Sequence, residues 1–353
     1  MKESSYYVLF YVAYPYYFPH FLPISAFLEA EGKKVRYVLS DKQNTGMMIQ
    51  IAEDNHLDYV VGDDTLYHTD TEFIFFANIF YPEQTLKAKK VMLWHGVGTK
   101  PYNFEEALTL NDILLVEGKY KYEKLVEAFP HYQEKIKKVG YSKLDSVQNI
   151  TKDELLSLRK KYKIDKEKKT ILYAPTFYPS SIEKMSDTFP DDFKDCNIIV
   201  KAHYMTFERK RYKNQIKKFE KWAKYENCII CEKDEYNLVP FLILSDIMVS
   251  DESAAVFEFA GLNKPVILNK FLKLRWTYRF NPKKLSKRLD QGMDKYRAIG
   301  DNALTYKEMV TLVYENIENP SKLEVSRLQM RDDICGVIDG NVSQRIFEVL
   351  ERV

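Results

Sequence analysis

The sequence predicts an α/β protein with two doubly wound domains, each a parallel sheet covered by helices on both faces. Short apolar segments without strict alternation recur along the chain, which is typical of strands that are buried on both faces. Segments with helical periodicity or helix-capping signals separate these strands. The length of 353 residues exceeds that of one average domain, so two domains of similar size are expected.

The first series of elements runs from the N-terminus to about residue 150. The apolar runs predict strands at 6–12, 35–39, 59–61, 73–76, 90–94 and 113–116, and the intervening periodicity predicts helices at 22–31, 47–55 and 119–129. The segment before the first helix is rich in aromatic residues, but Pro15, Pro19, His20 and Pro23 interrupt it. It contains no continuous run of about 20 apolar residues, so we predict neither a signal nor a membrane span there.

The second series begins with a helix at 151–162, where Thr151 and Glu154 have the spacing of a capping box. Strands are then predicted at 170–173, 197–200, 228–231, 247–250 and 265–268, and helices at 209–225, 238–244, 253–261, 305–318 and 342–353. We therefore expect an N-terminal acceptor-side domain over 1–150, a C-terminal nucleotide-donor domain over 151–340, and a last helix over 341–353 that packs back toward the first domain. Ligands of such sheets bind beyond the carboxyl ends of the strands, so the cleft between the domains is the predicted site.

Composition narrows the class of function and the cellular compartment. The 53 Lys and Arg residues nearly balance the 51 Asp and Glu residues, so a dedicated nucleic-acid binder is not expected. Cys228 and Cys231 have the spacing of a redox or zinc pair, but no second pair and no nearby histidine in the sequence accompany them. Buried cysteines in a reducing compartment are the favoured interpretation, which predicts a cytoplasmic protein.

Polar clusters follow four of the predicted strands. His95, Gly96 and Lys100 form the first, in which a histidine at a strand end precedes glycines that allow a ligand to approach closely. Pro175 and Thr176 form the second cluster. A structural histidine and an ordinary Pro-Thr turn are the alternatives to a ligand site at these two positions.

The other two clusters favour an anionic ligand. Lys201 and His203 follow the strand at 197–200, although a solvated surface pair would have the same pattern. The fourth cluster, at 250–258, carries a strand into a polar turn and then a helix that opens with small residues. The N–H groups and dipole of such a helix suit a phosphate, whereas an ordinary N-cap would explain Ser253 but not the whole cluster.

In this order, the clusters resemble the CDP-glycerol glycerophosphotransferase family, the teichoic-acid primases and polymerases. The resemblance runs from about residue 90 to the C-terminus and implies a GT-B-like fold of two Rossmann-like domains that face a central cleft. The matching segments are His95-Gly96 with Lys100, Gly140-x-x-Lys143-x-Asp145, Ile171–Thr176, Lys201-x-His203, Ser245-Asp246 with 250–253, Phe257-Glu258-Phe259, Asn263-Lys264-Pro265 and Asp339-Gly340. The implied reaction moves a glycerol phosphate or ribitol phosphate from a CDP-activated polyol to an acceptor hydroxyl and releases CMP, in synthesis of a teichoic-acid-like or capsular polymer.

The resemblance also implies roles for individual residues. His95 is the expected general base, and His203 is the expected second catalytic histidine. The implied donor-phosphate residues are Lys201, Asp251, Ser253, Ala254 and Thr176, the implied nucleotide residues are Glu258 and Pro175, and Gly96, Lys100 and Lys143 are expected elsewhere in the cleft. The sequence contains no acidic metal-binding motif of the DxD type, so no obligatory metal or other cofactor is predicted beyond the CDP-polyol donor.

Four departures leave the donor open. One is that the Arg-Gly-Phe segment usually seen before the last helices of the family is not recognisable around Arg275–Arg279. Phe177-Tyr178 stands where the family has an aromatic residue followed by Arg, Glu252 places an acid near the expected phosphates, and Glu258 replaces an Asp. A glycosyltransferase or epimerase that uses a UDP-sugar is therefore an alternative, and a non-catalytic polyanion-binding protein is a third hypothesis.

The partners of the protein are less constrained by the sequence. The implied acceptor is hydroxyl-bearing and either lipid-linked or polymeric. Two basic runs with interleaved aromatic residues, at 205–225 and 270–297, indicate either solvated helix faces or a surface for anionic lipids. A peripheral location on the inner face of the membrane and a homo-oligomer both stay open, and nucleic acid is not an expected partner.

Overall fold

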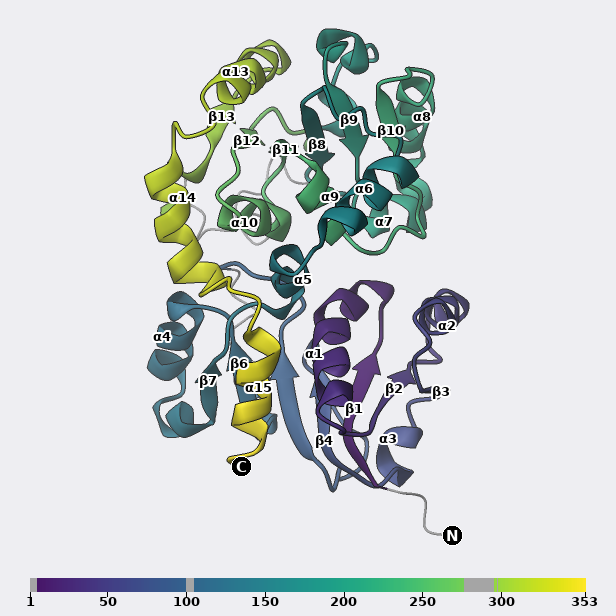
Figure 1. Cartoon of the computed structure of the whole chain (residues 1–353), viewed down its shortest axis with the longest axis vertical. Helices are drawn as coiled ribbons and strands as arrows, with labels where there is room; N and C mark the ends of the chain where they lie inside the picture. Colours follow the sequence, from purple (N-terminus) through teal and green to yellow (C-terminus); the bar gives the residue numbers. More distant parts are fainter. Residues whose placement is uncertain (1–4, 100–104, 276–294, 297) are drawn as a thin grey trace. The chain divides into compact units, whose positions relative to one another are not determined.

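The computed structural model describes residues 5–99, 105–275, 295–296 and 298–353. The chain forms two compact units, with 1–97, 101–149 and 333–353 in unit 1 and 98–100 and 150–332 in unit 2. Each unit contains one parallel sheet with helices packed around it, which confirms the predicted α/β fold class (Figure 1). Residues 333–340, which the sequence predicts as part of the C-terminal domain, cluster with unit 1.

Within the described residues, the sheet of unit 1 has seven parallel strands in the order β3-β2-β1-β4-β5-β6-β7. These strands are β1 Tyr6–Val12, β2 Val35–Leu39, β3 Tyr59–Val61, β4 Thr71–Phe76, β5 Lys89–Leu93, β6 Ile113–Val116 and β7 Ile136–Lys138. All seven residues of β1 are buried, as expected for a central strand covered on both faces. The strand order reverses between β1 and β4, and open α/β sheets bind ligands beside such a reversal.

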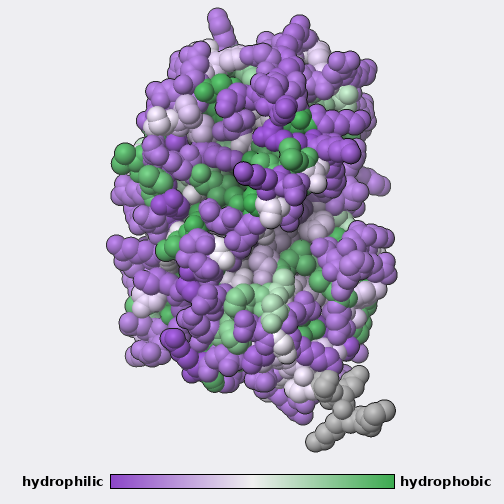
Figure 2. Space-filling view, viewed as in Figure 1, coloured by the Kyte–Doolittle hydropathy of each residue, from purple (hydrophilic) through white to green (hydrophobic). Residues whose placement is uncertain are grey.

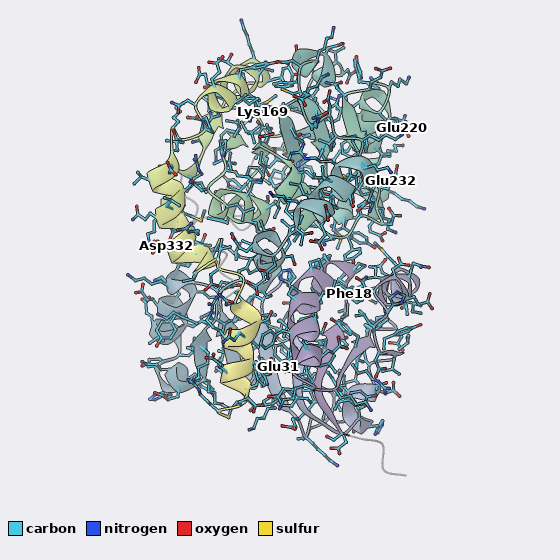
Figure 3. All side chains as sticks on the ribbon, in the orientation of Figure 1. Phe18, Glu31, Lys169, Glu220, Glu232 and Asp332 are labelled. Atoms are coloured by element: carbon cyan, nitrogen blue, oxygen red, sulfur yellow. The ribbon has the colours of Figure 1, made fainter. Side chains whose placement is uncertain are left out.

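The helices of unit 1 include two short ones that the sequence did not predict, Thr65–His68 and Asp145–Gln148, and the first helix starts earlier than predicted. The helices are α1 Phe18–Ala30, α2 Thr45–Asp54, α3 Thr65–His68, α4 Lys119–Ala128, α5 Asp145–Gln148 and α15 Val342–Leu350. The prediction that α1 begins at about Leu22 was wrong, because the 3-10 turn Pro15–Tyr17 (η1) leads directly into Phe18. Pro19 lies in the first turn of α1, where a helix needs no N–H donor. Figure 3 marks Phe18 at the start of α1 and Glu31 directly after its end.

Asp145 anchors the C-terminal helix of unit 1. Its carboxylate accepts hydrogen bonds from the backbone N–H groups of Val342 and Ser343, at 3.4 and 3.2 Å, and from the Ser343 hydroxyl at 3.4 Å. These N–H groups belong to the first turn of α15, which has no intrahelical acceptor for them. Because α15 packs beside α1 in this unit, the carboxylate ties the end of the chain to the first helix (Figure 1).

Unit 2 repeats the plan of unit 1 with a sheet in the order β10-β9-β8-β11-β12-β13. Its strands are β8 Thr170–Ala174, β9 Asn197–Val200, β10 Cys228–Ile230, β11 Ile247–Ser250, β12 Val266–Asn269 and β13 Asp301–Ala303. Its helices are α6 Lys152–Lys161, α7 Tyr204–Glu208, α8 Lys213–Trp222, α9 Val239–Leu244, α10 Ala254–Gly261, α13 Tyr306–Glu318 and α14 Glu324–Met330. The predicted capping box at the start of α6 is confirmed, since Thr151 and Glu154 each bond the backbone N–H of the other. The strand β13 escaped prediction because its sequence, Asp-Asn-Ala, has no apolar run.

The visible surface of the protein is mostly polar. The face seen in Figure 2 is largely hydrophilic, with hydrophobic residues in small separate groups. Among the described residues, no helix combines the length and the apolar character that crossing a bilayer requires.

All four cysteines are free and buried, and burial raises the pKa of Cys228 and of Cys231 to about 12. Their thiols are therefore held in the unreactive protonated form.

We predict that Asp145→Ala lowers the free energy of unfolding by about 1–2 kcal/mol, since two helix N–H groups lose their acceptor. Chemical denaturation followed by circular dichroism measures this change. The matched control is Glu348→Ala, an exposed position on α15, where we expect a change below about 0.5 kcal/mol. Equal stability of both variants would show that Asp145 does not anchor α15.

Candidate active site

The carboxyl ends of four neighbouring strands gather the candidate residues of unit 2. β9, β8, β11 and β12 are adjacent and parallel, so the segments that follow them share one edge of the sheet. These segments are 175–181 after β8, 201–203 after β9, 251–253 after β11, and Lys270 after β12. The structure therefore brings five of the predicted phosphate and nucleotide residues, namely Pro175, Thr176, Lys201, Asp251 and Ser253, to one edge together with His203.

Of the residues at this edge, Asp251 is buried beneath the surface. Its side chain is fully buried, and its carboxylate accepts hydrogen bonds from the Thr176 N–H at 3.1 Å, the Ser180 hydroxyl at 3.2 Å and the Ser181 N–H at 3.2 Å. Burial raises the pKa of Asp251 to about 7, although these donors oppose the shift. The oxygens are thus engaged with segment 176–181, so we propose that Asp251 positions this segment and does not itself contact a phosphate.

The start of α10 matches the expected phosphate cradle in part. Ser253 is the N-cap residue with extended backbone, and Ala254 is the first helical residue, so small side chains border the helix N–H groups. The Ser253 hydroxyl accepts no capping hydrogen bond from the helix N–H groups, but it lies 3.3 Å from the hydroxyl of Ser250. Glu252, the acid that departs from the family pattern, forms an ion pair with Lys270 at 2.6 Å. The lysine therefore balances the charge of this acid at the helix N-terminus.

The geometry of His203 defines its tautomer. His203 is the N-cap residue of α7, and its Nδ1 accepts a hydrogen bond from the Met205 N–H at 3.1 Å. A nitrogen that accepts a hydrogen bond carries the lone pair, so the proton of the neutral ring lies on Nε2. The exposed His203 side chain can thus donate a hydrogen bond from Nε2 to an anion without losing its place on the helix. The main chain of Lys201 bonds the Tyr173 carbonyl, which continues the ladder between β9 and β8.

His95 has the opposite tautomer. It follows β5 in unit 1, and its Nδ1 lies 2.6 Å from the carbonyl oxygen of Ala77, the residue after the neighbouring strand β4. A carbonyl only accepts, so Nδ1 donates and the lone pair of the neutral ring lies on Nε2. The His95 backbone N–H also donates to Ala77, at 3.2 Å. The ring contact holds the half-buried imidazole in the tautomer that can accept a proton at Nε2, and the main-chain contact fixes the backbone that carries the ring.

Two tyrosine rings lie against His95, and a buried histidine lies near it. The rings of Tyr17 and Tyr16, from η1, lie 5.1 and 5.6 Å from the imidazole centroid. His20 on α1 is buried, and burial together with the charges of Lys143 and His95 holds the pKa of His20 well below its usual value. Lys143 is itself buried in the turn Ser142–Leu144. The structure thus brings two predicted residues, His95 and Lys143, around a histidine that we had not selected.

A buried ion pair supports the strand end that carries His95. Lys121 and Glu117 are both buried and lie 2.7 Å apart, and the Lys121 ammonium lies 4.4 Å from the ring centroid of Trp94. Trp94 directly precedes His95, so this cation–π contact restrains the backbone that positions the imidazole. The spacing of Glu117 and Lys121 on a helix start was visible in the sequence, but their contact with Trp94 was not.

The remaining predicted residues are less informative. Gly96 follows His95 and is half-buried, Pro175 is buried, and Glu258 is buried on α10 with 2% exposure. Lys100 lies outside the described residues. In the described ranges, no group of three or more His, Cys, Asp or Glu side chains is arranged to hold a metal ion.

Comparison with solved structures defines the class of fold. The wall teichoic acid polymerase TagF aligns with a TM-score of 0.69 at 18% identity, over 98% of this chain and 88% of that chain. A putative UDP-N-acetylglucosamine 2-epimerase from Listeria monocytogenes aligns with a TM-score of 0.62 at 12% identity, over 99% of this chain and 96% of that chain. At such identities these matches show the fold alone, a two-sheet α/β architecture of the GT-B-like class.

The family is shown by a direct match. The model of the CDP-glycerol:poly(glycerophosphate) glycerophosphotransferase family matches residues 84–352, and the chain therefore belongs to this family. A teichoic acid poly(glycerol phosphate) polymerase of Bacillus spizizenii is 26% identical over 186 residues. That alignment covers 49% of this chain and 44% of the relative, so the match spans less than half of that polymerase. The resemblance predicted from the strand-end clusters is confirmed.

We predict that Asp251→Asn removes a pH dependence of stability. A folded-state pKa near 7, above the ordinary value of 3.8, means that the folded protein holds more protons than the unfolded chain between about pH 4 and 7. The contribution of Asp251 to stability therefore falls as the pH rises through this window. As the pH rises from 5 to 8, the free energy of unfolding of the Asn variant should increase by on the order of 2 kcal/mol relative to that of the wild type. Urea denaturation at each pH measures this change.

The control for this experiment is Glu220→Gln, an exposed carboxylate on α8 that is labelled in Figure 3. We expect its stability difference from the wild type to stay constant over the same pH range. A constant difference for Asp251→Asn as well would contradict a buried carboxylate that titrates near neutrality.

Proposed function

We propose that this protein transfers a polyol phosphate from a CDP-activated polyol to an acceptor hydroxyl and releases CMP, in synthesis of a teichoic-acid-type polymer. The family match over residues 84–352 carries this proposal, and it favours CDP-glycerol as the donor. In the reaction, the acceptor oxygen attacks the β-phosphorus, a new P–O bond forms, and the bond to the CMP oxygen breaks. The acceptor proton must be removed, and the charge on the phosphates must be neutralised.

The opposite tautomers of the two histidines support a division of these tasks. His95 presents a lone pair on Nε2 because Nδ1 donates to Ala77, so we assign it the role of general base toward the acceptor hydroxyl. His203 presents an N–H on Nε2 because Nδ1 accepts from Met205, so we assign it the role of hydrogen-bond donor to the donor phosphates. Each role follows from the backbone group beside Nδ1, which is a carbonyl for His95 and an N–H for His203.

The edge of the unit 2 sheet supplies the remaining groups for the donor. The N–H groups at Ser253 and Ala254 open α10 and suit a phosphate oxygen, and the hydroxyl of Thr176 lies on the segment that Asp251 positions. We propose that Lys201 binds the donor phosphates and that Glu258 and Pro175 contact the nucleotide. Their predicted roles rest on the family resemblance and on their place beside the same strands.

The alternative donor, a UDP-sugar, is not favoured. A protein of the same fold is described as a putative UDP-N-acetylglucosamine 2-epimerase, so the fold alone does not distinguish a CDP-activated donor from a UDP-sugar. The family match favours CDP-glycerol, because the family is that of the CDP-glycerol:poly(glycerophosphate) glycerophosphotransferases. A non-catalytic polyanion-binding protein would require neither histidine to be held in a single tautomer.

We further propose a lipid-linked or polymeric acceptor and a peripheral location at the membrane. The basic run at 205–225 lends this location little support, because Phe219 and Trp222 of α8 pack into the core of unit 2. Lys218 of the same helix pairs with Asp187 at 3.5 Å. The interpretation of α8 as a helix with a solvated basic face is therefore favoured, and most of the second run, 270–297, lies outside the described residues.

We predict that His95→Ala lowers turnover by about 10²- to 10⁴-fold, because the general base is lost, while the affinity for the donor changes little. Release of CMP from CDP-glycerol, with a lipid-linked glycerol phosphate oligomer as acceptor, measures turnover. His131→Ala, an exposed histidine on unit 1, is the control. Full activity of His95→Ala would refute the assignment, and turnover of a UDP-sugar in place of CDP-glycerol would transfer the proposal to the alternative enzyme.

A substitution at His203 can remove the Nε2 donor while keeping the hydrogen bond that caps α7. In His203→Asn the side-chain oxygen can still accept the Met205 N–H, but the Nε2 donor is gone. We expect a melting temperature close to that of the wild type and a loss of turnover of about 10- to 100-fold, as for a lost hydrogen bond to a charged group. A variant with wild-type turnover would show that His203 serves only as the cap of α7.

We predict that Glu252→Gln binds CDP about 3- to 10-fold more tightly than the wild type does. The substitution removes a negative charge beside the expected phosphate site and releases Lys270 from its ion pair. Titration calorimetry with CDP measures this change, and Glu232→Gln, an exposed acid labelled in Figure 3, is the control. Weaker binding by Glu252→Gln would instead assign the acid a direct role in holding the donor.

A further inference from the structure

An aromatic cluster lies beside His203 in unit 2. Tyr178 and Tyr212 are buried against each other with the partly buried Phe177, and the rings of Phe177 and Tyr212 meet edge to face at 5.9 Å. Phe177 also lies 4.8 Å from the imidazole of His203, measured between ring centroids. The cluster joins the segment after β8 to the 3-10 turn Lys210–Tyr212 (η8) and extends to the predicted phosphate histidine.

Two guanidinium groups rest on these rings. The central carbon of the Arg275 guanidinium lies 3.9 Å from the ring centroid of Tyr178, and its Nη2 donates to the Tyr212 hydroxyl at 2.6 Å. The central carbon of the Arg209 guanidinium lies 5.5 Å from the ring centroid of Phe177. A guanidinium that stacks on a ring keeps N–H donors along its edge, which can bind two oxygens of a phosphate at once.

Neither arginine is neutralised by an acid in the part of the chain that the structure describes. Other cations of unit 2 behave differently, since Lys270 pairs with Glu252 and Lys218 pairs with Asp187. The aromatic cluster thus gathers positive charge that no described carboxylate balances. An anion with more than one charged oxygen suits such a group of donors.

The backbone around Arg275 is held in place by the same segment that Asp251 positions. The Lys273 N–H donates to the Ser180 carbonyl at 2.8 Å in an antiparallel bridge, and the Arg275 N–H donates to the Tyr178 hydroxyl at 3.0 Å. The Ser180 hydroxyl in turn donates to Asp251. The guanidinium therefore needs little further ordering when a ligand binds, and this preorganisation favours affinity.

We propose that Arg275 and Arg209 bind the diphosphate of the donor beside His203, with Tyr178, Tyr212 and Phe177 as the surface that positions them. This inference rests on the proposed function, because the diphosphate is that of the CDP-polyol. The N–H edges of the two guanidinium groups and the Nε2–H of His203 supply donors to the same anion. No bond of the donor is broken by these groups, whose task is to hold the phosphates and neutralise their charge.

Titration calorimetry on the full chain tests this proposal with CDP-glycerol, CDP, CMP and inorganic pyrophosphate. We expect Arg275→Gln to lower the affinity for CDP-glycerol, CDP and pyrophosphate by about 10- to 100-fold. The affinity for CMP should fall by less, because CMP lacks the second phosphate. Arg209→Gln should weaken the same three ligands. Arg211→Gln, an exposed arginine of the same turn, is the matched control and should stay within about twofold.

Two further variants test the aromatic surface and guard against misfolding. Tyr212→Phe keeps the ring but removes the oxygen that accepts from Arg275, so we expect a smaller loss of diphosphate affinity. If Arg275→Gln lowers the melting temperature, Arg275→Lys decides the question. Lysine retains the charge, so it should recover part of the pyrophosphate affinity if the residue binds the anion, and none if the residue is only structural.

The outcomes separate this inference from the function on which it rests. Wild-type affinity for CDP-glycerol in both Arg275→Gln and Arg209→Gln would overturn the inference and leave the transferase standing. A wild-type protein that ignores cytidine ligands but binds pyrophosphate through Arg275 would overturn the transferase and retain the anion site. Pyrophosphate binding that is independent of both arginines would overturn the inference under either function.

Discussion

Asp251 accepts hydrogen bonds from segment 176–181, and the residues that we propose to bind the donor depend on this contact. A buried carboxylate is costly unless several donors surround it, so the segment and the strand end that carries Asp251 must keep their relative positions. The segment in turn carries Phe177 to His203 and Tyr178 to Arg275. One buried acid thus fixes the surroundings of several groups that we assign to the phosphates.

The two histidines show how backbone contacts select chemistry. Each follows a buried parallel strand, and nothing in the residue type distinguishes them. A carbonyl oxygen beside Nδ1 makes His95 an acceptor at Nε2, whereas an N–H beside Nδ1 makes His203 a donor at Nε2. The proposed general base and the proposed phosphate donor therefore differ through one neighbouring main-chain atom each.

Two of the residues that depart from the family pattern contact cationic side chains. Glu252, an acid at the start of α10, is paired with Lys270 from the strand end next to its own. Tyr178, which replaces a cation of the family, has the guanidinium of Arg275 on its ring. In both cases a cation lies against the residue that departs from the family pattern, so positive charge is present at both positions.

Several motif residues that carried the resemblance stabilise the fold instead of forming the site. Lys264 donates to the carbonyl oxygens of Leu242, Ile243 and Ser245 at the end of α9, and burial lowers its pKa to about 8. Asp145 similarly serves the first turn of α15. The sequence by itself determined the fold class, most of the strands and helices along each half of the chain, the capping box and the clusters at strand ends, because periodicity and capping are local properties. Only the tertiary structure decided the tautomers of His95 and His203, the burial of Asp251 and the partners of Glu252 and Tyr178, because these depend on atoms that are distant in the chain and meet only after folding.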